Sequence, residues 1–258
     1  MLNTLRYGEA SQQVPLLIVH GLFGSARNWG AIAKRLSDSR EVISVDMRNH
    51  GDSPWRDSHS YADLAGDLAD VIRAEGRALD VLGHSMGGKA AMVLALTRPD
   101  LVNRLLVADI APVAYGHSQS HLIRAMRDLP LDELSSRAEA DAALARAVED
   151  PSVRAFLLQS LDLRASPPRW RLNLDVLEAE MDKIIGWPEI SASFKGPALF
   201  LSGGRSDYVR PEHRPAVRAL FEQARFAKLP EAGHWLHAEA PRPFEQTARM
   251  WFDCGPFD

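Results

Sequence analysis

The chain has 258 residues, of which 46% are hydrophobic, enough to bury the core of a large α/β domain. Its formal net charge of −4, with acids and bases mixed along the chain, offers no basic face for nucleic acid or for a membrane surface. No apolar run approaches the roughly 18 residues of a membrane span. The single cysteine, Cys254, cannot form a disulfide within one chain, which favours a cytoplasmic location.

Strand-like and helix-like segments alternate in the first 110 residues. Continuous apolar runs, typical of parallel strands buried on both faces, predict strands at 14–19, 41–46, 79–82 and 104–110. Apolar residues at helical spacing predict helices near 29–36, 61–72 and 86–98. Ser60 is the expected N-cap of the second helix, and Pro99 stops the third. This alternation predicts a mainly parallel sheet with helices on both faces.

The pattern changes after residue 111. We expect no strand between about 112 and 188, and helical stretches near 118–129, 131–149, 151–163 and 174–186. Strands at 197–202 and 224–229 follow, with helices near 211–222 and 241–252. We therefore predict a core made of residues 1–111 and 189–258. Residues 112–188 form a helical cap, inserted before the last two strands, that acts as a lid over the crevice at the carboxyl ends of the strands.

The most informative motif is Gly83-His84-Ser85-Met86-Gly87, between a predicted strand and a predicted helix. The pattern Gly-x-Ser-x-Gly in this context is typical of a nucleophile elbow, where a serine hydroxyl is exposed on a tight turn. Glycines are needed there because side chains would collide with the adjacent strand and helix. Ser85 is therefore the expected nucleophile.

A serine hydroxyl needs a base to take its proton and an acid to orient that base. In an elbow-type hydrolase the acid follows the serine in the chain and the histidine comes last. His234, in the loop after the last predicted strand, is the expected base. Asp207, after the strand at 197–202, is the first choice for the acid. Asp109, at the end of the strand at 104–110, is its rival, and position in the sequence leaves the choice open.

Two backbone amides are expected to bind the oxyanion. One is the N–H of Met86, which follows the nucleophile, and the other is the N–H of Leu22, in the glycine-containing loop His20-Gly21-Leu22-Phe23-Gly24. The histidines are scattered and no Cys-x-x-Cys pair is present, so we predict no metal site. No Gly-x-Gly-x-x-Gly follows the first predicted strand, and we expect no cofactor.

Taken together, these motifs resemble the α/β-hydrolase fold superfamily, and the match spans nearly the whole chain. Within it, two segments resemble a group of small acyl esterases found in bacteria and as mitochondrial abhydrolase-domain proteins: Asp46 to Ser53, read as a structural turn, and Trp170 to Leu174. Some members of that group take their acid from the earlier strand, where Asp109 lies. The resemblance implies hydrolysis of short to medium acyl esters or thioesters.

The leading functional hypothesis is a cofactor-independent serine carboxylesterase that forms an acyl-enzyme on Ser85 and acts on a small-molecule acyl ester. The same site suits a carbon–carbon bond hydrolase, a perhydrolase or a lyase of menaquinone synthesis, because a fold does not fix a reaction. A ligand-binding receptor with a vestigial site is the hypothesis from another class. The sequence leaves the oligomeric state open.

Overall fold

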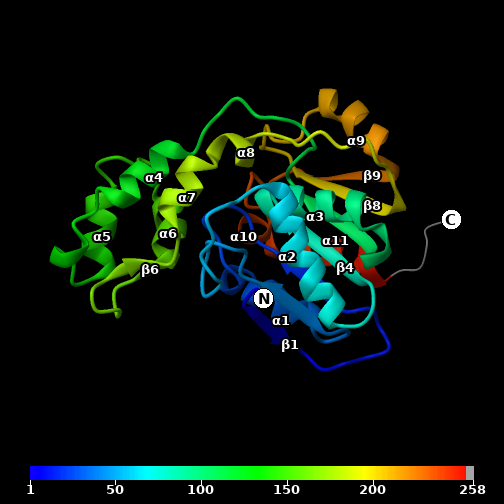
Figure 1. The fold of residues 1–258 in the computed structure, drawn as a ribbon, viewed down its shortest axis with the longest axis horizontal. Coiled ribbons are helices and arrows are strands. Elements are labelled where there is room, and N and C mark those ends of the chain that lie inside the picture. Colours follow the sequence, from blue (N-terminus) through cyan, green and yellow to red (C-terminus); the bar gives the residue numbers. More distant parts are fainter. Residues whose placement is uncertain (254–258) are drawn as a thin grey trace.

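The structure is a computed structural model that describes residues 1–253; Cys254 lies outside the described residues. Its centre is a seven-stranded sheet in the order β1-β3-β2-β4-β5-β8-β9, parallel except for β1, which runs antiparallel to β3 at one edge (Figure 1). The strands are β1 (Thr4–Tyr7), β2 (Leu16–Val19), β3 (Val42–Val45), β4 (Leu79–His84), β5 (Val102–Ala108), β8 (Phe194–Gly203) and β9 (Phe221–Leu229).

Helices cover both faces of this sheet. Along β2, Leu17 and Val19 join the hydrophobic cluster that includes α2 and α3, whereas Leu16 and Ile18 join the cluster of α1 and α11 on the other face. Successive strand residues point to opposite faces, which explains why the buried strands read as continuous apolar runs. The helices of the core are α1 (Gly30–Leu36), α2 (Tyr61–Ala74), α3 (Met86–Thr97), α9 (Arg214–Leu220), α10 (Leu236–Glu239) and α11 (Pro241–Asp253).

The ends of two core helices follow the local sequence. Ser60 caps α2 as expected: its hydroxyl accepts from the N–H of Asp63 at 3.2 Å, and the Asp63 carboxylate accepts from the N–H of Ser60 at 3.3 Å. The helix α3 ends at Thr97, two residues before Pro99. Arg98, directly before that proline, leaves the helical region with φ −141° and ψ 61°, because a proline disfavours helical backbone in the residue before it.

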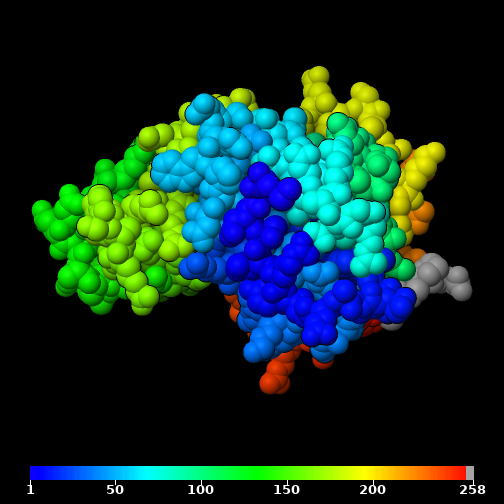
Figure 2. Space-filling view, turned by 60° about the horizontal axis from the view of Figure 1, so that its bottom comes forward, coloured from blue at the N-terminus to red at the C-terminus, as the bar shows by residue number. Residues whose placement is uncertain are grey.

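Between β5 and β8 the chain leaves the sheet, and much of residues 112–188, which we call the insertion, lies to one side of the core (Figure 1). Short polar contacts join it to the core. Residues 49–51 pair with residues 171–173: the N–H of Gly51 donates to the Arg171 carbonyl at 2.8 Å, and the N–H of Asn173 donates to the Asn49 carbonyl at 3.0 Å. Figure 2 shows this neighbourhood on the surface, where the light-blue segment of the core meets the yellow-green part of the insertion. The elements of the insertion are α4 (Ser120–Arg127), α5 (Arg137–Leu144), α6 (Pro151–Leu157), β6 (Leu161–Asp162), β7 (Arg169–Trp170), α7 (Leu174–Ala179) and α8 (Met181–Ile185).

Several predicted elements need correction. The insertion does contain strands: β6 and β7, of two residues each, pair in an antiparallel hairpin. The sequence predicts instead that the helix at 151–163 continues to residue 163. The helix expected at 131–149 is a 3-10 turn, Leu131–Glu133, followed by α5, since the hydroxyl of Ser136 caps a new helix by accepting from the N–H of Glu139. The stretch 174–186 divides at Glu180 into α7 and α8. Finally, β9 starts at Phe221 and so shortens the helix expected at 211–222.

Candidate active site

Ser85 lies on the turn between β4 and α3, at the carboxyl end of a central strand. Its backbone has φ 52° and ψ −122°, a conformation that non-glycine residues rarely adopt. A Cβ atom on Gly87 would collide with the carbonyl oxygen of His20, and one on Gly83 would collide with the carbonyl of Gly87 itself. The glycines therefore allow the close approach of strand, loop and helix that holds Ser85 in this strained turn.

His234 comes from the loop between β9 and α10 and meets Ser85 across the sheet edge. Its Nε2 lies 3.1 Å from the Ser85 Oγ, and its side chain is 21% exposed. The backbone carbonyl of His234 accepts a hydrogen bond from Nε2 of His84 at 2.8 Å. Because His84 directly precedes Ser85, this bond fixes the loop of His234 to the turn that carries Ser85.

The carboxylate that pairs with His234 belongs to Asp109. Its Oδ2 lies 2.8 Å from Nδ1 of His234, and the residue is fully buried at the end of β5. The same carboxylate accepts from the backbone N–H of Gly203 at 2.9 Å and from the hydroxyl of Ser206. Asp109 has φ 52°, so it also lies on a strained turn after a central strand. A buried carboxylate with these three donors is held in a single position.

The expected pairing of Asp207 with His234 is not what the structure has. Asp207 is exposed, and its backbone carbonyl accepts from Nε of Arg210 at 3.1 Å. The preceding residue, Ser206, is the one whose side chain reaches Asp109. The turn after β8 therefore turns Ser206 inward and leaves Asp207 at the surface, and the rival candidate Asp109 occupies the position beside the imidazole.

The loop after β2 passes next to Ser85. A Cβ atom on Gly21 would lie only 3.1 Å from the Cβ of Ser85. The loop is braced by two buried histidines: Nε2 of His20 accepts from the N–H of Met47 at 2.9 Å, and Nε2 of His50 accepts from the N–H of Phe23 at 3.2 Å. Within residues 1–253, no protein acceptor is found for the N–H of Leu22.

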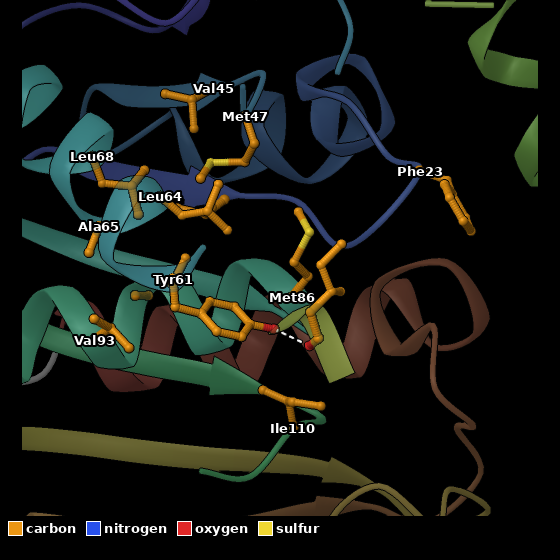
Figure 3. Packing of buried hydrophobic residues seen from close by; sticks show 14 of the residues in the cluster. Phe23, Val45, Met47, Tyr61, Leu64, Ala65, Leu68, Met86, Val93 and Ile110 are labelled. Carbon is orange, nitrogen blue, oxygen red and sulfur yellow. Dashed lines mark hydrogen bonds between the residues drawn. The ribbon is translucent and has the colours of Figure 1, made fainter. Parts of the chain in front are cut away.

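Met86, the other expected oxyanion donor, is the first residue of α3. Its N–H therefore has no partner within the helix and lies at the positive end of the helix dipole. The Met86 side chain belongs to the buried cluster drawn in Figure 3. Packing of this side chain holds the backbone amide in place next to Ser85 before any substrate binds.

An aromatic ring that the sequence analysis did not single out covers the imidazole of His234. Tyr208 stacks on it with ring centroids 4.0 Å apart and an angle of 20° between the planes. The Tyr208 hydroxyl lies 2.8 Å from Nε2 of His117, which belongs to the insertion and precedes α4. No sequence motif marks such a residue, because the contact depends on how the turn after β8 meets the loop after β9.

The other histidines near the site are held neutral by burial. Burial lowers the pKa of His20, and it lowers the pKa of His84 well below the usual value for histidine. Burial also lowers the pKa of His237 to about 3; its ring stacks on Trp29 with centroids 4.0 Å apart. These residues pack and brace the loops of the site.

A cavity of about 270 Å³ opens beside Ser85 between the core and the insertion. The insertion contributes apolar side chains to its wall, among them Leu122, Phe156, Leu157 and Ile184. Phe156 faces Trp235 of the core with ring centroids 5.6 Å apart. The cavity is suited to an apolar group attached to a carbonyl carbon at Ser85.

The described residues contain no group of three or more histidine, cysteine, aspartate or glutamate side chains placed to hold a metal ion. His117 and His121 have the spacing of two ligands on one helical face, but α4 begins at Ser120, so His117 precedes the helix. No helix within residues 1–253 is long and apolar enough to cross a membrane.

The chain is similar in sequence and in structure to known hydrolases. A family model described as alpha/beta hydrolase fold matches residues 14–241. The chain is 42% identical to the sn-1-specific diacylglycerol lipase ABHD11 of Mus musculus over 89% of its own length and 78% of that protein. It is 39% identical to the esterase YbfF of Escherichia coli (strain K12) over 93% of each chain. A solved structure of a marine microorganism esterase superposes with a TM-score of 0.92, at 36% identity, over 97% of this chain and 98% of the other.

Proposed function

Because the chain belongs to the alpha/beta hydrolase fold family, we propose that it is a serine carboxylesterase that hydrolyses short- to medium-chain acyl esters or thioesters through an acyl-enzyme on Ser85. One observation carries the proposal. An unbroken chain of hydrogen bonds leads from the Ser85 hydroxyl to His234 and on to the buried carboxylate of Asp109. The chain is similar in sequence to proteins named as an esterase and a lipase over most of their length. This similarity supports the same class of reaction.

In the first half of the reaction, Nε2 of His234 takes the proton from Ser85 as Oγ attacks the acyl carbon. The N–H groups of Leu22 and Met86 then bind the negative oxygen of the tetrahedral intermediate, and losing one such donor typically costs about 2.7–4 kcal/mol in the transition state. His234 returns its proton to the leaving alcohol. In the second half, His234 activates a water molecule that hydrolyses the acyl-enzyme.

Asp109 has the role that we first assigned to Asp207. Its carboxylate accepts the Nδ1–H of His234, which leaves Nε2 unprotonated and facing Ser85. The hydrogen bonds from Gly203 and Ser206 hold that carboxylate against the imidazole. A negative charge at this position also stabilises the imidazolium that forms during each half of the reaction.

The cavity supports small substrates. Its volume of about 270 Å³ lies just below the range of about 300–1,000 Å³ of pockets that take drug-sized ligands. The insertion forms much of its apolar wall, which supports the proposed role of residues 112–188 as a cap that selects the acyl group. Since the chain has one cysteine and no need of an oxidising compartment, we place this activity in the cytoplasm.

The experiment is a series of p-nitrophenyl esters of increasing acyl length, assayed with the wild type and with Ser85→Ala. We expect turnover to be highest for short to medium chains and to disappear in the variant, which should keep its circular dichroism spectrum and melting temperature. Full activity of a folded Ser85→Ala protein would disprove the mechanism. Activity on carbon–carbon bonded diketones without activity on esters would assign the site to another reaction of the fold.

A further inference from the structure

One charged side chain lines the cavity and has no role in the steps above. Lys89 lies in the first turn of α3, four residues after Ser85, and its backbone N–H donates to the Ser85 carbonyl at 3.0 Å. It is 1% exposed. Of the described residues that line the cavity, Lys89 is the one lysine or arginine, and none is an aspartate or glutamate. A buried ammonium group without an opposite charge is unfavourable, so its presence needs a physical reason.

Among the described residues, the surroundings of the Lys89 ammonium leave one of its three N–H groups without a hydrogen-bond acceptor. Nζ donates to the carbonyl oxygens of Ile185 at 2.9 Å and Gly186 at 2.5 Å. It also lies 4.7 Å from the ring centre of Tyr115 and 5.6 Å from that of Tyr61. An ammonium group has three N–H donors, and the described residues accept from two. Burial lowers the pKa of Lys89 to about 7, and no neighbouring acid acts against that shift.

We propose that Lys89 binds a carboxylate at the far end of the substrate's acyl group, so that the preferred substrates are esters of short dicarboxylic acids. The inference rests on the proposed esterase function and specifies its substrate class. A substrate carboxylate would accept the third N–H of Lys89 and would supply the opposite charge that the cavity wall lacks. Charge-assisted hydrogen bonds of this kind are about twice as strong as neutral ones.

The acyl group, and not the alcohol, is assigned to Lys89 because of how the cavity is enclosed. Lys89 itself is 1% exposed, and beside it Tyr61 is 4% and Ile184 is 6% exposed, whereas Tyr115, Ile185 and Gly186 are half-buried. The Tyr61 hydroxyl donates to the Ile184 carbonyl at 2.6 Å, the dashed line in Figure 3, which ties this wall together. Two other residues that line the cavity are more accessible: His117 is exposed and Trp235 is partly exposed. The alcohol must leave before water attacks, so it needs the accessible side.

The bonds from Lys89 to Ile185, the last residue of α8, and to Gly186 also connect α3 to the end of the insertion. If Lys89 had only this structural role, removing its hydrogen bonds would change kcat/KM for all substrates by the same factor. A binding role predicts a change in the ratio of two kcat/KM values, one for an ester whose acyl chain ends in a carboxylate and one for a neutral ester of equal chain length. The ratio is measured within one protein, so a partial loss of folded enzyme cancels.

We therefore propose to measure this ratio with paired p-nitrophenyl esters, below the pKa of Lys89. The wild type should favour the carboxylate ester by about tenfold or more, the size of one charge-assisted contact. Lys89→Met should lower the ratio by a similar factor, mainly through KM, and Lys89→Arg should retain part of it. The control is Lys183→Met on α8, which removes an exposed lysine paired with Glu180 and should leave the ratio unchanged.

Three results would contradict the inference. A wild type that favours the neutral ester, while hydrolysing both, overturns it and leaves the esterase function standing. A carboxylate preference that survives in both Lys89 variants assigns the preference to other residues. A folded wild type that hydrolyses neither ester overturns the proposed function itself, and the inference with it.

Discussion

Among single residues, the carboxylate that orients His234 matters most to the proposed mechanism. Asp109 is buried and lies 2.8 Å from Nδ1 of the imidazole, whereas Asp207 is exposed. Asp109→Asn should reduce kcat by about 10⁴-fold, because the amide cannot hold the imidazole in the tautomer that accepts the serine proton. Asp207→Asn should change kcat by no more than a few-fold. The measurement is steady-state hydrolysis of a short p-nitrophenyl ester, and a larger loss for Asp207→Asn would reverse the assignment.

These two aspartates also show how far the sequence predicts the site. Ser85 and His234 follow from local patterns, since a nucleophile elbow and a glycine-preceded histidine after the last strand can each be read from a few residues. Which carboxylate lies beside His234 depends on the turn after β8, where the side chain of Ser206, and not that of Asp207, points inward. The stacking of Tyr208 on His234 depends on the same turn. The path of the turn after β8 is set by tertiary contacts, and no short sequence pattern encodes those contacts.

At the scale of elements, the turn between β4 and α3 is the least tolerant of change. Gly87→Ala should strongly destabilise the protein, because the new methyl group would overlap the carbonyl oxygens of Val19 and His20, and backbone atoms cannot easily move. Gly66→Ala is a matched control within α2: a Cβ there meets nothing within 4 Å, so the free energy of unfolding should rise by roughly 0.5–1 kcal/mol. Urea unfolding measures both. Equal stability of the two variants would refute this description of the turn.

The elements themselves were predicted unevenly. The buried strands β2, β3, β4 and β5 come from continuous apolar runs, and their order along the chain is as expected. The edge strand β1 was missed, because it is four residues long, only half-buried and paired on one side. Inside the insertion, the hairpin of β6 and β7 was missed for the same physical reason: two-residue strands carry no periodicity.

At the scale of the whole molecule, acid sensitivity should come from histidines buried around the loops of the site. His20, His50, His59 and His84 are at most 3% exposed, and burial lowers the pKa of each, that of His59 to about 3. A histidine that is harder to protonate when folded gives its full stability above its unfolded pKa of about 6.5 and loses it as the pH falls toward the folded value. The native state should therefore weaken in acid.

For His59 alone, linkage predicts a loss of roughly 2 kcal/mol in the free energy of unfolding between about pH 7 and pH 5. Urea unfolding at the two pH values measures the total, and His59→Gln should flatten the dependence by about its own share. An unfolding free energy that is equal or larger at about pH 5 would contradict the neutral state of these buried histidines.

In the proposed mechanism, Ser85 is a nucleophile activated through His234 and Asp109. The most direct measurement is mass spectrometry of the intact and digested protein after reaction with a fluorophosphonate, which reacts with activated serines. We expect one label per chain, located on Ser85, no label in folded Ser85→Ala, and slow labelling in Asp109→Asn. A wild type that stays unlabelled while folded, or a label that persists in Ser85→Ala, would contradict this mechanism.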